Sequence, residues 1–513
     1  MATWKAVLGA TGAAGYIPSQ AFFCAFSRIN YVPNREHRLQ CGDSEGNAYF
    51  MTMHRGNQHA SRYTSAGQYQ EYALHQFDKD ADYQSTGWVY PTPKNSFMES
   101  SGSNLYCFSD DTILASGFLE DSSISSLYPL YMGEWSPSTF TSGPDTEFAL
   151  SATANHYLFG PSDNIVEDSS GNKLINSRVN PGSGYRHAIL KYNSDFTSLI
   201  WGKYLTGMIR LDTARMTTDD SDNIYMIATG SNYRKVNIVK LNSSGVVQWS
   251  REIGENNQAQ TGALAINPST GDLIYVYRDR YVLDAGNQDA AIVVSLDVSN
   301  GQTINWKTGI RAGGSGKSLI PVSCDCDVDG NIYIGLDTYL TGTGGYRYSW
   351  GISAVTSLDK DGNFIWANAF DPDGKDSYGG QDFGSVQLKS CSYDKHTHTL
   401  LLHKELNKYN GDRWAGFARV PADGSLSDAS VEHSIGYGTH AVCYFPVSNA
   451  ANLASADSSN IYAANYTHTL TNNALSNTAT NIPGSSSVTR TSNLNYPTGN
   501  VDDSASMYDA DIN

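Results

Sequence analysis

The chain has 513 residues, of which 17% are charged, and a formal net charge of −17. This acidic balance argues against nucleic-acid binding through a basic face and against docking on an anionic membrane. Glycine, tyrosine and short alternating apolar runs dominate the sequence, and no run of 18 apolar residues occurs. The composition therefore predicts an all-β protein without a membrane span.

The N-terminal region predicts a short strand but no targeting segment. The first residues alternate around Trp4 and end in Gly9, and they lack the basic and apolar regions of a signal peptide. The seven cysteines are scattered and odd in number, which is not the pattern of a disulfide framework. We therefore expect a protein that is made in the cytoplasm and keeps its thiols reduced.

A turn followed by a strand with a tyrosine recurs along the chain at intervals of roughly 50 to 70 residues, the range of large propeller repeats. "DSEGNAYFM", "DDSDNIYMIATG" and "DVDGNIYIG" are its clearest copies. Counting the degenerate copies gives eight, centred on Tyr49, Tyr106, Tyr157, Tyr225, Tyr275, Tyr333, Leu401 and Tyr462. Each unit reads as a meander of about four short strands, which buries its faces only when units stack around an axis.

A second element, an apolar strand and a turn leading to a tryptophan strand, follows most copies. "NIVKLNSSGVVQW" and "AVTSLDKDGNFIW" are typical. The predicted structural tryptophans are Trp4, Trp88, Trp201, Trp249, Trp306 and Trp366, with Trp135 as a further candidate in the second unit. This pattern resembles the tryptophan-docking repeats of the PQQ-dependent quinoproteins, an eight-bladed propeller class. The resemblance implies that each tryptophan packs between neighbouring blades.

We therefore expect residues 1–480 to form one β-propeller of eight blades, each of four antiparallel strands. Seven blades is the alternative, if residues 94–143 are an insertion. The last unit lacks a tryptophan strand, and "TWKAVLG" at residues 3–9 supplies one, so the N-terminal strand is predicted to close the ring. Residues 481–513 form a polar C-terminal tail, whose composition favours disorder unless a neighbour orders it.

Two weak metal patterns occur. Asp325, Asp327 and Asp329 match the start of a calcium loop, although Leu336 stands where a bidentate glutamate belongs. The alternative is an Asx-turn that leads into a strand, as in the other repeats. His396 and His398 form an H-x-H pair without a third ligand nearby.

No catalytic constellation emerges from the sequence. "GGSGKSL" at residues 313–319 lacks the first glycine of a phosphate-binding loop, since Arg311 stands there. The quinoprotein resemblance extends to architecture alone, because the chain has no adjacent cysteine pair. We therefore predict no catalytic residue and no cofactor.

The sequence favours a non-enzymatic structural or interaction protein of a virus particle, such as a bacteriophage tail component acting in assembly or host attachment. The predicted partners are other virion proteins in a symmetric assembly, and a glycan or protein of the host surface. The predicted location is the virion. The alternatives are a secreted quinoprotein-like or glycan-active enzyme and a cytosolic interaction scaffold.

Overall fold

The computed structural model describes twenty-six segments of the chain. They are residues 23–29, 39–55, 70–79, 83–89, 96–98, 104–121, 130–138, 145–151, 165–179, 186–205, 215–229, 236–254, 259–279, 290–312, 317–341, 347–348, 353–372, 383–408, 413–424, 429–434, 439–447, 461–465, 471–474, 479–481, 489–492 and 508–509. Among these residues no helix is long and apolar enough to cross a membrane.

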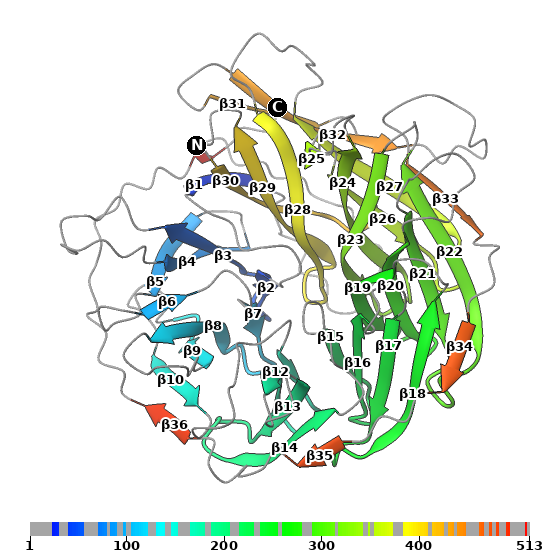
Figure 1. The fold of residues 1–513 in the computed structure, drawn as a ribbon. Coiled ribbons are helices and arrows are strands. Elements are labelled where there is room, and N and C mark those ends of the chain that lie inside the picture. The colour runs from blue at the N-terminus through cyan, green and yellow to red at the C-terminus, as the bar shows by residue number, and fades with distance from the viewer. Residues whose placement is uncertain are drawn as a thin grey trace.

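Seven antiparallel sheets surround a common axis as the blades of a propeller (Figure 1). The first blade contains β2 (Gln40–Gly42), β3 (Ala48–Arg55), β4 (Gln70–Phe77) and β5 (Tyr83–Val89). The second contains β7 (Asn104–Cys107), β8 (Ile113–Asp121), β9 (Leu130–Trp135) and β10 (Thr146–Ser151), with β6 (Ser96–Met98) beside β8. The third contains β11 (Ile165–Glu167), β12 (Lys173–Val179), β13 (Arg186–Tyr192) and β14 (Leu199–Leu205).

The next three blades repeat this order. The fourth blade contains β15 (Arg215–Thr218), β16 (Ile224–Thr229), β17 (Val236–Leu241) and β18 (Val247–Gly254). The fifth contains β19 (Ala259–Ile266), β20 (Leu273–Asp279), β21 (Ala290–Leu296) and β22 (Ile304–Ala312). The sixth contains β23 (Lys317–Cys326), β24 (Ile332–Thr341), β26 (Ser353–Leu358) and β27 (Phe364–Pro372), with β25 (Arg347–Tyr348) beside β24. The seventh blade contains β28 (Phe383–Asp394), β29 (Thr399–Lys408) and β30 (Arg413–Pro421).

The hydrophobic core lies between the blades. Every residue of β21 is buried, because neighbouring blades cover both faces of this strand. One apolar cluster joins Tyr225 and Ile238 of the fourth blade to Tyr275 and Ile292 of the fifth. A single meander could not bury both of its faces, so the stacking of blades stabilises the strands.

The chain closes the ring with an N-terminal strand. β1 (Phe23–Ile29) pairs antiparallel with β30 along its whole length and so becomes the fourth strand of the seventh blade. β1 occupies the position that the sequence analysis gave to residues 3–9, and those residues lie outside the described part of the chain. The two ends of the propeller are thereby tied together in one sheet.

The C-terminal segment runs around the rim of the propeller and adds strands to six blades (Figure 1). We call these strands the rim belt. They are β31 (Ala429–Ser434) and β32 (Thr439–Val447) on the sixth blade, β33 (Ile461–Asn465) on the fifth, β34 (Thr471–Ala474) on the fourth, β35 (Ala479–Asn481) on the third, β36 (Thr489–Ser492) on the second and β37 (Tyr508–Asp509) on the seventh. From β32 to β36 the belt visits the blades in the reverse of their order along the chain.

The prediction of eight blades is wrong, and the rim belt explains the error. Tyr462, which marked the eighth repeat, lies on β33 and pairs with Arg311 at the outer edge of the fifth blade. Tyr106 lies on the innermost strand of the second blade, before its turn rather than after it. The third blade's turn leads to Leu174, whereas Tyr157, the residue counted there, lies outside the described residues. The alternative of seven blades is confirmed, but residues 94–143 are not an insertion, because most of the second blade comes from them.

Candidate functional site

The tight turns of successive blades meet on one face of the propeller, which we call the turn face. In each blade the first-to-second and third-to-fourth strand connections leave the sheet at the same end, because the strands are antiparallel. The connections at residues 168–172 and 219–223 are examples from neighbouring blades. The turn face is therefore where residues from different blades come together.

In several blades an aspartate organises the first turn, because its carboxylate accepts hydrogen bonds from several groups of that turn. The Asp327 carboxylate accepts hydrogen bonds from the backbone N of Asp329 at 3.0 Å and of Asn331 at 2.8 Å. It also accepts from the Asn331 amide and the Tyr333 hydroxyl, both at 2.8 Å. Asp43 and Asp219 do the same in the first and fourth blades. The Asp-x-x-x-Asn-x-Tyr spacing thus forms an Asx-turn that the tyrosine completes.

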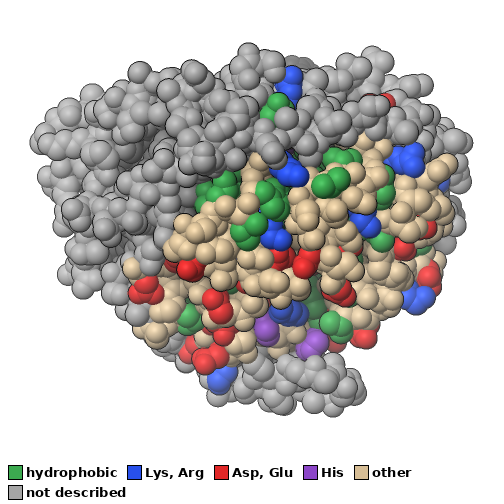
Figure 2. Space-filling view, turned by 90° about the horizontal axis from the view of Figure 1, so that it is seen from below, with side chains coloured by type: hydrophobic (Ala, Val, Ile, Leu, Met, Phe, Trp, Pro, Cys, Tyr) green, Lys and Arg blue, Asp and Glu red, His purple; other side chains and the backbone are tan. Residues whose placement is uncertain are grey.

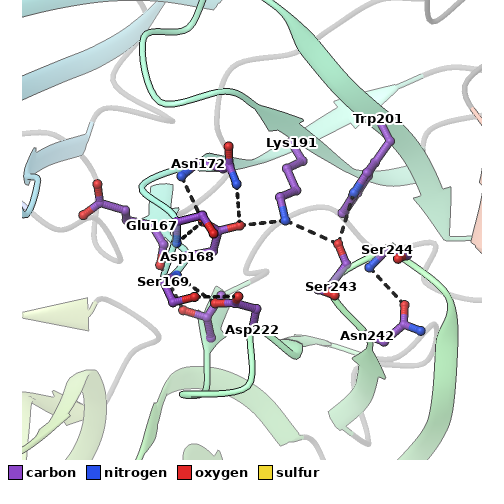
Figure 3. A network of polar contacts seen from close by, with 12 residues as sticks. Glu167, Asp168, Ser169, Asn172, Lys191, Trp201, Asp222, Asn242, Ser243 and Ser244 are labelled. Atoms are coloured by element: carbon purple, nitrogen blue, oxygen red, sulfur yellow. Dashed lines mark hydrogen bonds and ion pairs between the residues drawn. The ribbon is translucent and has the colours of Figure 1, made fainter.

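The third blade replaces the tyrosine with an ion pair (Figure 3). Leu174 occupies the tyrosine position, and Lys191, which lies opposite it on β13, places Nζ 2.6 Å from the Asp168 carboxylate. Burial alone would raise the pKa of Asp168, but hydrogen bonds from Lys191 and Asn172 outweigh it and hold the pKa below its ordinary value. Lys191 thus stabilises a carboxylate that is only 7% exposed.

Serine and aspartate side chains join the turns of neighbouring blades. The backbone N and Oγ of Ser169 donate to the Asp222 carboxylate at 2.7 and 2.8 Å (Figure 3). Ser44 makes the same two contacts with Asp111. Asp222 and Asp111 have φ values of 59° and 64°, a region where glycine is usual and where Gly171 stands in the third blade. The inter-blade contacts account for aspartate at these strained positions.

Four tryptophans contact the turn of the next blade. The indole Nε1 atoms of Trp201, Trp249 and Trp306 donate to backbone carbonyls of Ser243, Val298 and Lys360 at 3.3, 3.0 and 2.9 Å. A Cβ built on Gly301, Gly362 or Gly424 would lie 2.5–2.6 Å from the ring of Trp249, Trp306 or Trp366. The glycines of these turns, each of which follows the third strand of its blade, are thus required by the rings that pack on them.

The other predicted tryptophans lie elsewhere. In the third blade Trp201 lies opposite Lys191. The equivalent position in the first blade holds Ser85, which lies opposite Gln76, and Trp88 lies three residues further along β5. Trp135 ends β9, the third strand of its blade, and is fully buried in an apolar cluster that also contains Cys41 and Tyr49 of the first blade. Trp4 lies outside the described residues.

The aspartates of the calcium motif serve separate contacts. Asp327 organises its turn, while Asp325 accepts from the backbone N of Cys326 and, across the blade junction, from that of Tyr393 at 3.0 Å. Asp329 is exposed. His398 hydrogen-bonds to the Tyr393 hydroxyl at 2.5 Å. In the described segments no three histidine, cysteine, aspartate or glutamate side chains form a group that could hold a metal ion.

Sequence reasoning missed the residues that join the blades. A serine one residue after the turn aspartate, and an acid at the glycine position of the next turn, are visible in "DSSG" and "DDSD". Lys191 gives a weaker signal, because its role depends on the loss of tyrosine at Leu174 on another strand. Either signal can be recognised only when the blades are aligned correctly, and the count of eight units aligned them wrongly.

Replacing Lys191 with methionine should lower the free energy of unfolding by about 3 kcal/mol at pH 7, because the buried Asp168 charge loses its cation. The folded-state pKa of Asp168 is depressed, so this contribution is present above about pH 3.9 and is lost as the pH falls through the folded value. Urea unfolding of both proteins at pH 7 and pH 3 measures it. Lys240→Met is the matched control, since Tyr225 completes the turn there, and an equal loss in both variants would contradict the assigned role of Lys191.

The chain matches no protein-family model and no curated protein sequence. Solved structures with some likeness include a polysaccharide lyase, with a TM-score of 0.35, 8% identity, and coverage of 65% of this chain and 94% of that one. An exo-β-1,3-galactanase from Clostridium thermocellum gives 0.32, 10%, 81% and 96%, and a glucose dehydrogenase gives 0.30, 8%, 76% and 99%. Scores this low carry no argument about function.

Proposed function

We propose that this protein works through its surface as a rigid interaction platform, and that it is a structural component of a virus particle, associated with a tail and acting in assembly or host attachment. The rim belt carries the proposal. Six of the seven blades end in a strand of the C-terminal segment, so their outermost strands are only two to six residues long. Edges this short are poor templates for strands of other chains, which leaves the two faces of the propeller for partners.

The turn face offers suitable contacts. Ile200, Val246, Val328 and Ile365 are each 46–59% exposed, and each lies in or beside a tight turn. On the side of the molecule that Figure 2 shows, acidic, basic and hydrophobic side chains are interspersed among other side chains and backbone. A partner that docks on the turn face would cover these four apolar side chains.

The test is mass spectrometry of density-banded particles beside the soluble, membrane and secreted fractions of the source culture. We expect the chain to band with a major capsid protein in a fixed ratio that high salt does not change. Recovery only in the soluble or secreted fraction would overturn the virion assignment. The cytosolic scaffold and the secreted enzyme would then be separated by partner capture and by assays for bound cofactor and calcium.

A further inference from the structure

Buried ionisable side chains are concentrated where the last blade meets the first. We call this contact between β28–β30 and β2–β4 the closing junction. Six charged or histidine side chains of the last blade are each 4% exposed or less: Lys389, Asp394, His403, Lys404, Glu405 and Arg419. Burying charge is costly unless partners compensate for it, so the protonation state of this junction affects its stability.

Two histidines from the two blades contact one aromatic ring at this junction. His403 on β29 lies opposite Phe417 on β30, with 5.5 Å between the ring centroids. Phe417 also contacts His75 and Phe50 of the first blade, at 5.0 and 4.9 Å between centroids. Both histidines are buried, and His75 is hydrogen-bonded to the Thr52 hydroxyl at 2.9 Å. Two histidine rings therefore border the aromatic contact that joins the blades.

Burial and one neighbouring cation oppose a proton on His403, and they outweigh a hydrogen bond with the backbone of Met51 in the first blade, which favours it. Lys389 on β28 lies 2.5 Å from the Glu405 carboxylate, so this buried acid is already paired. Arg419 on β30 is fully buried and donates to the backbone O of Gly46 in the first blade. Burial, together with the Lys389 cation, lowers the pKa of His403 to about 3. His403 is therefore neutral in the closed junction, and a protonated His403 would be a buried cation that the Lys389 cation repels.

We propose that the closing junction is an acid-sensitive latch: on acidification His403 takes up a proton, and the first and last blades separate while the junction of the fourth and fifth blades stays closed. An exposed histidine binds its proton near pH 6.5, whereas the closed junction excludes it until near pH 3. Linkage then favours the open junction by about 30-fold at pH 5 relative to pH 8. The described strands of the fourth and fifth blades contain no histidine, so no histidine linkage acts at the apolar cluster between them.

Hydrogen exchange followed by mass spectrometry at pH 7.5 and pH 5 tests this proposal on the full chain. After correction for the chemical exchange rate, opening of β3 and β29 should rise about 30-fold at pH 5. Opening of β20 and β21 in the fifth blade should stay unchanged. Equal acceleration in all blades, or none at β3 and β29, would overturn the latch, and this comparison needs no variant.

A His403→Gln variant should lose the acid-dependent opening of β3 and β29, because the side chain no longer titrates. His187→Gln is the matched control, since His187 is equally buried but lies on β13 in the third blade. Persistent acceleration in His403→Gln would show that another group drives the opening. If glutamine does not fit, His403→Asn removes the same proton with a smaller side chain.

Discussion

Removing residues 1–30 should leave a propeller that no longer closes, with the loss of a large part of the roughly 5–15 kcal/mol that stabilises a folded domain. β1 supplies the fourth strand of the last blade and pairs with β30 over seven residues, from Phe23 opposite Arg419 to Ile29 opposite Arg413. Without it, β30 has an exposed edge and the two ends of the ring are not held in one sheet. Thermal unfolding and size-exclusion chromatography should show a much lower transition and aggregated material.

A shorter truncation provides the control. Removing residues 2–9 keeps β1 and tests directly whether Trp4 and its neighbours add to ring closure. We expect the longer truncation to be far more destabilising than the shorter one. A synthetic peptide of residues 21–31 should restore part of the stability to the longer truncation by refilling the position beside β30. An unchanged melting temperature after removal of residues 1–30 would contradict closure by β1.

Much of the propeller could be predicted from local sequence. The turn signals before Tyr49, Tyr225, Tyr275 and Tyr333 lie at real first-to-second strand turns, because an aspartate or asparagine, a glycine or its substitute, and the strand that follows occur within a few residues. An N-terminal strand does close the ring, but it is β1 rather than residues 3–9, and it completes the seventh blade rather than an eighth unit at Tyr462.

The rim belt could not be predicted in this way. Its strands are three to five residues long on the second to fifth blades, and residues such as Asn473 and Thr480 have no apolar alternation that marks a strand. Their pairing depends on outer strands that lie more than a hundred residues away, such as Glu252 opposite Asn473. Tyr462 carries the turn-like signal of an inner strand yet lies at the rim, and this coincidence produced the eighth blade.

A side chain added at Gly362, where the ring of Trp306 packs, should also cause a large loss of stability. Gly362→Ala should lower the free energy of unfolding by about 3–5 kcal/mol. Gly362 has a φ of 82°, which disfavours any side chain, and its Cβ would lie 2.5 Å from Cε3 of Trp306. The indole cannot withdraw freely, because its Nε1 donates to the Lys360 carbonyl at 2.9 Å.

Gly271→Ala separates the two causes of this loss. Gly271 has a similar φ of 75°, but a Cβ there meets nothing within 4 Å, so it should cost only the backbone strain of about 1–2 kcal/mol. Trp306→Ala removes the ring and should cost about 3 kcal/mol. In the double variant Trp306→Ala/Gly362→Ala the added methyl group has no ring to meet. The loss of stability in the double variant should therefore be well below the sum of the losses in the two single variants. Additive losses would mean that the ring does not pack on this turn.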